Sequence, residues 1–258
     1  MAPLLHHKSM GDAPEHLLIV HGLFGQLDNW NTLARSFAEH FTVHLLDLRN
    51  HGRSFHHSDA SHGAMAQDLV DYMQEQGIEK AHMIGHSLGG KVVMKLAISH
   101  PELIDKAIIA DIAPVEYPPQ HLEILEGLQA VDFEKIEERA EVDEVLKNHI
   151  RSTAVRQFLL KNVFRTKEDK FAFRFNLQAL KDSYYELIGN SLVPGDMSSN
   201  EMLFLYGGQS DYVAEDNKAL IQGFFPNAKF DVIEKAGHWL HAEAPDEFLE
   251  KSLDFLQG

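Results

Sequence analysis

Ser87 is the residue whose neighbours best suit covalent chemistry. It lies in A-H-M-I-G-H-S-L-G-G (81–90), where an apolar run precedes it and K-V-V-M-K-L-A-I-S follows. A G-x-S-x-G pattern between a strand and a helix exposes the serine side chain at the tip of a sharp turn. The helix directs free N–H groups and its positive dipole end toward the oxygen of any group that the serine attacks. Gly and Ser are common turn residues, but the strand and helix on either side favour a nucleophile.

A second loop is predicted to stabilise negative charge beside this serine. The apolar run 16–20 continues into H-G-L-F-G (21–25), which contains glycines and leaves a predicted strand. Acyl transfer needs two backbone N–H groups at the developing oxyanion, one after the nucleophile and one from a loop beside the neighbouring strand. We assign these donors to Leu88 and Leu23, with Phe24 as the alternative for the second. Alone, this loop would be an ordinary strand-to-helix turn.

The proton acceptor is predicted near the end of the chain. His238 follows the last predicted strand in K-A-G-H-W-L-H-A-E-A-P, and we assign it the role of general base. His241 is assigned a structural role at the start of the next helix. Asp111, at the tip of one strand, and Asp211, after the penultimate strand, both suit the order Ser, Asp, His. Spacing alone does not choose between these two acids.

These residues fall at the ends of strands in a regular alternation of strands and helices. Apolar runs typical of a parallel sheet covered on both faces occur at 16–20, 81–85 and 202–206, and further strands are predicted at 42–46, 106–111 and 229–234. The sequence therefore predicts an α/β fold with a mostly parallel central sheet flanked by helices. Residues 1–115 and 195–258 form its predicted core.

The alternation stops between residues 116 and 194, which we call the insertion. Its apolar spacing predicts mainly helices, with a short strand within 171–175 and one helix over 177–188. Such an insertion is expected to act as a cap that supplies apolar pocket walls and excludes water. It also carries a basic run: Lys147, Arg151, Arg156, Lys161, Arg165, Lys167, Lys170 and Arg174. Either these cations contact an anionic substrate tail or, as the favoured interpretation, they pair with a preceding acidic segment on solvated helix faces.

The segment D-L-R-N-H-G-R-S (47–54) is predicted to be a structural turn. We expect Asp47 and Arg49 to pair locally and Gly52 to supply an unusual backbone angle. Several histidines crowd this part of the chain: His51, His56, His57 and His62. Because no H-E-x-x-H helix or pair of carboxylates accompanies them, a solvated loop is favoured over a metal site.

Composition narrows the possible functions. The 258 residues can form one large core, and a net charge of -16 argues against nucleic acids and anionic membranes as partners. The absence of cysteine excludes disulfides and thiolate catalysis. The N-terminal residues lack the apolar run of a signal peptide, and no segment approaches the ~18 apolar residues of a membrane span. We therefore expect a cytoplasmic protein, of undetermined oligomeric state.

Several motifs together resemble the YbfF-like esterases of the α/β-hydrolase superfamily: H-G-L-F-G, D-L-R-N-H-G-R-S, G-H-S-L-G-G-K, D-I-A-P-V, G-G-Q-S-D-Y-V and G-H-W-L-H-A-E. The resemblance extends over nearly the whole chain, and D-I-A-P-V and G-G-Q-S are its most specific parts. It implies the α/β-hydrolase fold with a mainly helical cap, Asp111 as the acid, and Ser210 as a hydroxyl that supports the acid. Asp211 departs from the family pattern, which requires no acid there, and stays an alternate acid.

The predicted function is that of a serine carboxylester hydrolase. Ser87, His238 and Asp111 would work through an acyl-enzyme intermediate, without cofactor or metal. The resemblance implies simple acyl esters as substrates, and the basic run of the insertion keeps acyl thioesters such as acyl-CoA open. Two alternatives are a non-catalytic small-molecule sensor on the same scaffold and a C–C hydrolase or acyltransferase of the same fold.

Overall fold

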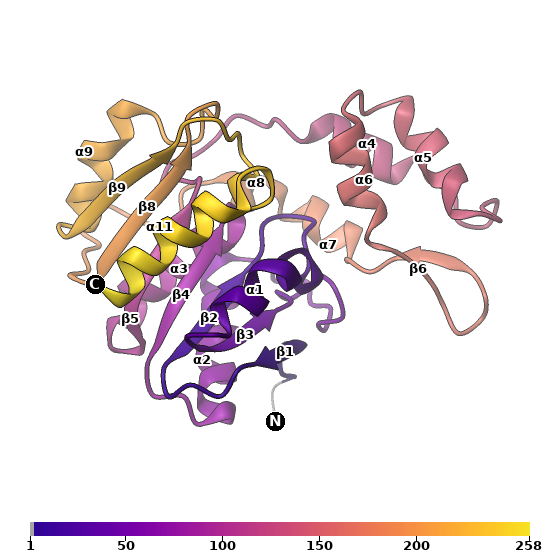
Figure 1. Ribbon diagram of the computed structural model, residues 1–258. Helices are drawn as coiled ribbons and strands as arrows, with labels where there is room; N and C mark the ends of the chain where they lie inside the picture. Colours follow the sequence, from indigo (N-terminus) through magenta and orange to yellow (C-terminus); the bar gives the residue numbers. More distant parts are fainter. Residues whose placement is uncertain (1–2) are drawn as a thin grey trace.

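The computed structural model of the protein describes residues 3–258, built around a seven-stranded sheet (Figure 1). The strands are β1 (His7–Met10), β2 (His16–Val20), β3 (Thr42–Leu46), β4 (Ala81–His86), β5 (Ile104–Ala110), β8 (Glu201–Gly207) and β9 (Ala228–Ile233). Their order is β1-β3-β2-β4-β5-β8-β9, and only the β1–β3 pairing is antiparallel. The predicted mostly parallel sheet is therefore confirmed. Residues 1–2 of the predicted core lie outside the described part.

Helices cover both faces of the sheet. The core helices are η1 (Leu27–Trp30), α1 (Asn31–Phe37), α2 (His62–Gln76), α3 (Leu88–Ser99), η2 (Pro101–Leu103), α9 (Glu215–Phe224), α10 (Leu240–Glu243) and α11 (Pro245–Gln257). α1 and α11 pack on one face, and α2, α3 and α9 on the other (Figure 1). On β2, Leu17 and Ile19 belong to the apolar cluster beneath α1 and α11, whereas Leu18 and Val20 belong to the cluster beneath α2, α3 and α9. Burial of both faces explains the continuous apolar runs. Among the described helices, none has the length and apolar character needed to cross a membrane.

Between β5 and β8 the chain leaves the sheet. It forms α4 (Leu122–Gln129), α5 (Arg139–Lys147), α6 (Thr153–Leu160), β6 (Val163–Arg165), β7 (Phe171–Phe173), α7 (Leu177–Asp182) and α8 (Tyr184–Ile188). Figure 1 shows α4, α5 and α6 beyond one end of the sheet. The short strand expected within 171–175 is present as β7. The prediction of a single helix over 177–188 is wrong. The backbone at Ser183, with ψ near 5°, departs from helical geometry and divides the segment into α7 and α8.

A buried lysine fixes both connections of the insertion to the core. Lys91, on α3, is 1% exposed, and its ammonium group donates hydrogen bonds to the carbonyl oxygens of Val115 (2.8 Å), Ile188 (2.9 Å) and Gly189. It also lies 4.9 Å from the centre of the Tyr117 ring. Burial lowers the pKa of Lys91 to about 7. The chain therefore enters and leaves the insertion at points held by one side chain of α3.

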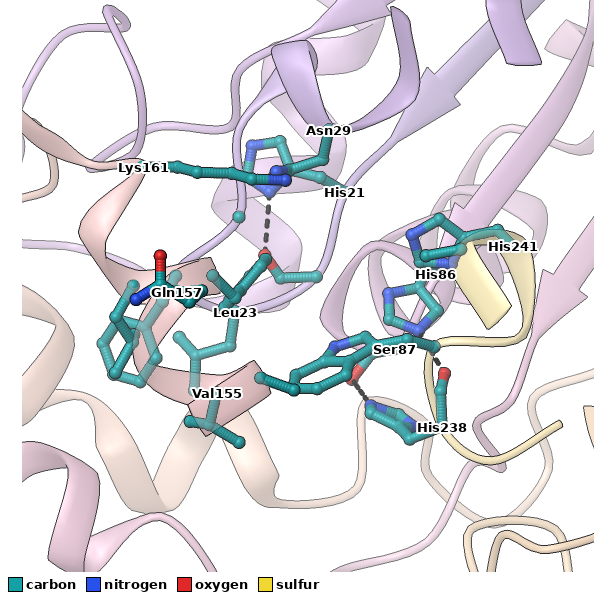
Figure 2. A pocket seen from close by; sticks show the side chains of 18 of the residues that line it. His21, Leu23, Asn29, His86, Ser87, Val155, Gln157, Lys161, His238 and His241 are labelled. Carbon is teal, nitrogen blue, oxygen red and sulfur yellow. Dashed lines mark hydrogen bonds between the residues drawn. The ribbon is translucent and has the colours of Figure 1, made fainter. Parts of the chain in front are cut away.

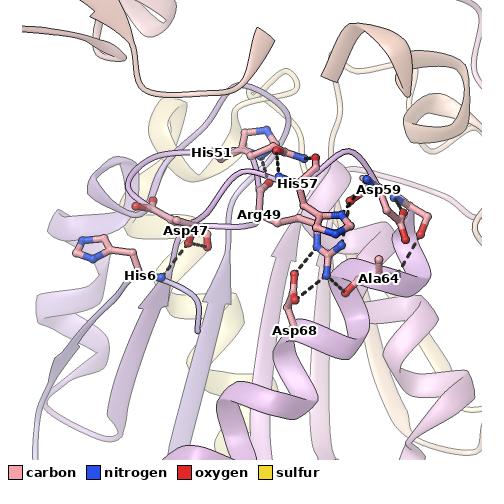
Figure 3. A network of polar contacts seen from close by, with 11 residues as sticks. His6, Asp47, Arg49, His51, His57, Asp59, Ala64 and Asp68 are labelled. Atoms are coloured by element: carbon pink, nitrogen blue, oxygen red, sulfur yellow. Dashed lines mark hydrogen bonds and ion pairs between the residues drawn. The ribbon is translucent and has the colours of Figure 1, made fainter. Parts of the chain in front are cut away.

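The loop after β3 forms a rigid turn around Asp47 (Figure 3). The Asp47 carboxylate accepts hydrogen bonds from the N–H groups of Leu27 (2.7 Å) and Arg53 (2.8 Å). Gly52 has a φ of +52°, and a Cβ there would lie 2.1 Å from the Asp47 carboxyl carbon. The predicted structural turn is confirmed, but Asp47 pairs with backbone N–H groups and not with Arg49.

Arg49 reaches instead to α2. Its Nε and Nη2 atoms contact the two carboxylate oxygens of Asp68 at 2.6 and 2.7 Å, and the guanidinium group also donates to the carbonyl oxygens of Asp59 and Ala64 (Figure 3). This pair is buried. Burial raises the pKa of Asp68 although Arg49 opposes the shift, so the ion pair forms at a desolvation cost.

The expectation of a solvated histidine loop is wrong for two of its members. His51 and His62 are buried, and burial lowers their pKa values to about 3 and about 4. His62 packs beneath the insertion, with Nε2 3.2 Å from the Leu187 carbonyl oxygen. His56 and His57 are exposed, as expected. Across residues 3–258, no group of three or more His, Asp or Glu side chains is arranged to hold a metal ion.

Asp68→Ala is expected to destabilise the fold, because it leaves the buried Arg49 guanidinium without its carboxylate. Removing one partner of a buried ion pair costs about 3–5 kcal/mol. Urea unfolding should show a decrease in the free energy of unfolding near the lower limit, because Arg49 keeps its two contacts with carbonyl oxygens. Glu75→Ala, at an exposed position of the same helix, serves as the control and should change the free energy of unfolding by less than about 0.5 kcal/mol. Equal effects of the two substitutions would contradict this account.

Candidate active site

The backbone turn between β4 and α3 holds Ser87 in an uncommon conformation. Its φ is +52° and its ψ is −117°, outside the regions that non-glycine residues normally occupy. The turn needs glycine on both sides, because a Cβ at Gly85 would lie 2.5 Å from the Gly89 carbonyl oxygen, and a Cβ at Gly89 would lie 2.4 Å from the Val20 carbonyl oxygen. Ser87 itself is partly exposed, whereas its neighbours in β4 and α3 are buried. The turn therefore presents a single hydroxyl at the end of the sheet.

Ser87, His238 and Asp111 form a continuous chain of polar contacts. The Ser87 Oγ lies 3.1 Å from His238 Nε2 (Figure 2), and His238 Nδ1 lies 2.7 Å from Asp111 Oδ2. The serine follows β4, the aspartate follows β5, and the histidine lies in the loop after β9. Residues that are 24 and 127 positions apart in sequence thus meet because parallel strands end at the same edge of the sheet.

The carboxylate of Asp111 is buried and fully engaged. The residue is 0% exposed, with a φ of +51°. Besides His238, it accepts hydrogen bonds from the Ser210 hydroxyl (2.5 Å) and the Gly207 N–H (3.0 Å). Asp211, the alternate acid, is exposed, and the Nδ1 atom of His238 contacts Asp111 instead. The predicted acid and its supporting hydroxyl therefore lie side by side.

Two tyrosines that the sequence analysis did not assign hold this arrangement. The Tyr212 ring stacks on the His238 imidazole, with centroids 4.0 Å apart and planes at 19°. The Tyr117 hydroxyl donates to the Tyr212 carbonyl oxygen (2.6 Å) and accepts from the Ala113 N–H (2.8 Å). Tyr117 thereby joins the loop that carries Asp111 to the loop that carries Ser210. The only sequence signal was the place of Tyr212 within G-G-Q-S-D-Y-V.

The two predicted oxyanion donors flank the serine. Leu88 is the first residue of α3, whose initial N–H groups lack intrahelical acceptors. Leu23 lies in the loop after β2, and a Cβ at the preceding Gly22 would lie 3.1 Å from the Ser87 Cβ, so this loop packs against the serine. Within residues 3–258, the Leu23 N–H has no hydrogen-bond acceptor. Leu23, Leu88 and Ser87 also border one small cavity of about 30 Å³.

A larger cavity of about 330 Å³ opens from Ser87 and His238 (Figure 2). Core and insertion both contribute apolar walls: Leu23, Trp30, Ile124, Val155, Phe158 and Trp239. Ile124 comes from α4, and Val155 and Phe158 come from α6. The insertion therefore forms one side of the space in front of the serine.

Histidines other than His238 line this cavity in their neutral form. Burial lowers the pKa of His21 to about 4, of His121 to about 4 and of His241 to about 3, and that of His86 well below its ordinary value. His241 lies in α10, where its ring stacks on Trp30 with centroids 4.2 Å apart. Its contact with Trp30 fits the structural role expected for it.

Most of the basic run lies away from the cavity. Four of its members pair with carboxylates: Lys147 with Glu144, Arg156 with Asp143, Arg165 with Asp169 and Lys170 with Glu134. Three of these carboxylates belong to the preceding acidic segment, as the favoured interpretation holds, whereas Asp169 lies within the basic run and Arg156 is buried instead of solvated. Lys161 is the one member of the run that lines the cavity, together with Asn29 and Gln157. The sequence did not distinguish Lys161 from its neighbours.

Comparisons with known proteins agree with the fold. Residues 15–245 match the family model described as alpha/beta hydrolase fold. The chain is 40% identical to Esterase YbfF of Escherichia coli (strain K12), over 93% of this chain and 92% of that protein. It is 34% identical to sn-1-specific diacylglycerol lipase ABHD11 of Mus musculus, over 98% of this chain and 85% of that protein.

A solved structure extends the same relationship to three dimensions. A marine microorganism esterase superposes with a TM-score of 0.96 at 35% identity, over 98% of this chain and 100% of that one. The resemblance that the motifs indicated is thus confirmed across almost the whole length. The chain belongs to the alpha/beta hydrolase fold family, in the group that contains the YbfF-like esterases.

Proposed function

We propose that the protein is a serine carboxylester hydrolase that cleaves acyl esters through an acyl-enzyme intermediate. The observation that carries this proposal is the unbroken contact chain from the Ser87 hydroxyl through His238 to Asp111, with Ser87 and His238 lining a largely apolar cavity. The names of the relatives, an esterase and a lipase, support ester substrates. Every part of the reaction is supplied by side chains and backbone, so no cofactor or metal is required.

Proton transfer is the role assigned to the pair of His238 and Asp111. As the Ser87 oxygen attacks the acyl carbon, His238 Nε2 takes its proton, and it later returns a proton to the leaving group. Asp111 holds the Nδ1–H tautomer and stabilises the imidazolium. Ser210 and the Gly207 N–H bind the same carboxylate, which fixes its orientation.

Two backbone N–H groups are proposed to stabilise the negative charge that develops on the acyl oxygen. Leu88, at the positive end of α3, and Leu23, in the loop packed on Ser87, are the proposed donors. Removal of a single such donor typically costs about 10²–10³ in kcat. Backbone donors held by the Ser87 turn and by the loop after β2 need no reorganisation during the reaction.

The insertion, residues 116–194, is proposed to be a cap on a core formed by residues 1–115 and 195–258. Its walls from α4 and α6 would bind the apolar part of a substrate and exclude water. The same mechanism would act on acyl thioesters such as acyl-CoA, because both substrates give the same acyl-enzyme.

Ser87→Ala tests the enzymatic function itself. The wild type is expected to hydrolyse p-nitrophenyl esters and to be labelled by a fluorophosphonate probe, and Ser87→Ala should abolish labelling and lower kcat by about 10⁴-fold or more. Ser99→Ala, at the exposed end of the same helix, serves as the control and should behave as wild type. Specific ligand binding by a wild type that neither turns over esters nor reacts with the probe would instead support a sensor.

Asp111→Asn and Asp211→Asn form a matched pair that tests the acid. Asp111→Asn should lower kcat by about 10³–10⁴-fold, because the imidazole loses the carboxylate that fixes its tautomer. Asp211→Asn should lower it by less than about tenfold, since that side chain is exposed. Steady-state kinetics with one p-nitrophenyl ester measure both effects, and the opposite ranking would assign the acid to Asp211.

A further inference from the structure

The larger cavity differs in charge from the rest of the protein. The chain carries 39 acidic and 23 basic residues, yet no Asp or Glu in the described part of the chain lines this cavity. Four of its histidines are neutral at pH 7, because burial lowers their pKa values. Lys161 is the one lining side chain with a permanent charge. The space that would receive substrate is therefore locally cationic in a strongly acidic molecule.

Lys161 has no competing partner of opposite charge. No carboxylate in residues 3–258 lies within 4.0 Å of its ammonium group, whereas nearby members of the basic run are paired. Its positive charge acts on the cavity, since it contributes to the lowered pKa of His241. A substrate anion would therefore meet a free cation, without first displacing an acidic side chain.

The backbone at Lys161 is fixed to the core. Its carbonyl oxygen accepts a hydrogen bond from the Gln26 side chain (3.1 Å), and the next residue, Asn162, donates through its side chain to the Phe24 carbonyl oxygen (2.8 Å). Asn162 is 1% exposed. The exposed lysine side chain thus starts from a defined point beside the loop that carries Leu23.

A second polar group accompanies Lys161 at the same end of the cavity. Figure 2 shows Lys161 and Asn29 together, on the opposite side from Ser87 and His238. The Asn29 side-chain oxygen accepts from the Gln26 N–H (2.8 Å), which leaves its amide N–H₂ to donate. An ammonium group and an amide N–H₂ group offer donors only, which suits a carboxylate.

We propose that Lys161 and Asn29 form an anion subsite, and that preferred substrates are esters with a carboxylate at the far end of the chain that fills the cavity. This inference rests on the proposed ester hydrolysis and names its substrate class. The anion would contact Lys161 equally in the ground state and the transition state, because it lies away from the reacting carbonyl. Its effect should therefore appear in KM and not in kcat.

Two pairs of matched esters test the subsite. The first pair places the charge in the acyl half, with mono-4-nitrophenyl glutarate against its neutral analogue 4-nitrophenyl 5-oxohexanoate. The second pair places the charge in the alcohol half and compares the butanoyl ester of 5-hydroxypentanoate with the butanoyl ester of 6-hydroxyhexan-2-one. Hydrolysis of this pair is measured by pH-stat. We expect the wild type to prefer the charged member of one pair by about tenfold in kcat/KM, and that pair identifies which half occupies the cavity.

Variants at position 161 show whether this preference comes from the lysine. Lys161→Met should remove the preference by raising KM for the charged ester about tenfold, with the neutral ester changed less than twofold. Lys161→Arg should keep the preference, and Lys161→Glu should reverse it. Lys167→Met, in the exposed β6–β7 turn outside the cavity, is the control and should leave the preference unchanged. Added salt should weaken the preference of the wild type.

The outcomes separate the subsite from the enzymatic function. Turnover of both members of each pair, with no preference that depends on Lys161, would overturn the anion subsite and leave the hydrolase intact. A loss of activity on charged and neutral esters alike in Lys161→Met would also overturn it, because that pattern indicates a structural role. Failure of the wild type to cleave any of the esters, with Ser87 unlabelled by a fluorophosphonate probe, would instead contradict the proposed function.

Discussion

The close approach of β2 to the turn at Ser87 is the constraint on which the rest of the site depends. A positive φ at a serine costs about 1–3 kcal/mol and persists only where surrounding packing holds it. Gly85 and Gly89 allow the backbones to cross without side chains between them, and Gly89 packs directly on the Val20 carbonyl. The same contact brings the loop after β2 against Ser87. One steric arrangement therefore positions both the hydroxyl and the loop that holds the second proposed oxyanion donor.

The buried carboxylate at Asp111 imposes a second requirement. A carboxylate that is 0% exposed loses the hydration that would stabilise its charge, so it needs several donors. The parallel pairing of β5 with β8 places Ala110 beside Leu205, which brings the Gly207 N–H and the Ser210 hydroxyl to the carboxylate. His238 supplies the third contact. Tyr117 joins the loops after β5 and β8, and Tyr212 stacks on His238, so Asp111 and His238 are held as one unit. Lys91 fixes the insertion beside this unit.

Local patterns in the sequence were sufficient to predict the sheet, the turn at Ser87 and the loop that carries His238, since each depends on residues close in sequence. The acid was different. Asp111 and Asp211 both follow strands, and only the fold shows that the first is buried against His238 while the second is exposed. The resemblance, and not the spacing, favoured Asp111 as the acid. Lys91 and Tyr117 escaped prediction because their partners are backbone carbonyls or loops distant in sequence. His51 is buried beside the ring of His21, from the loop after β2, with centroids 5.1 Å apart, so its burial also depends on residues distant in sequence.

The distribution of charge in the cavity suits the chemistry proposed for Ser87. A carboxylate near the serine would repel the negative charge that develops on the acyl oxygen, and repulsion is strong where apolar walls exclude water. Neutral histidines avoid this penalty, because they provide polar edges without a net charge. A cation close to Asp111 would compete with His238 for the carboxylate. Lys161 and Asn29 lie on the opposite side of the cavity from Ser87 and His238 (Figure 2), so the proposed anion subsite would be separate from the charges that move in the proposed reaction.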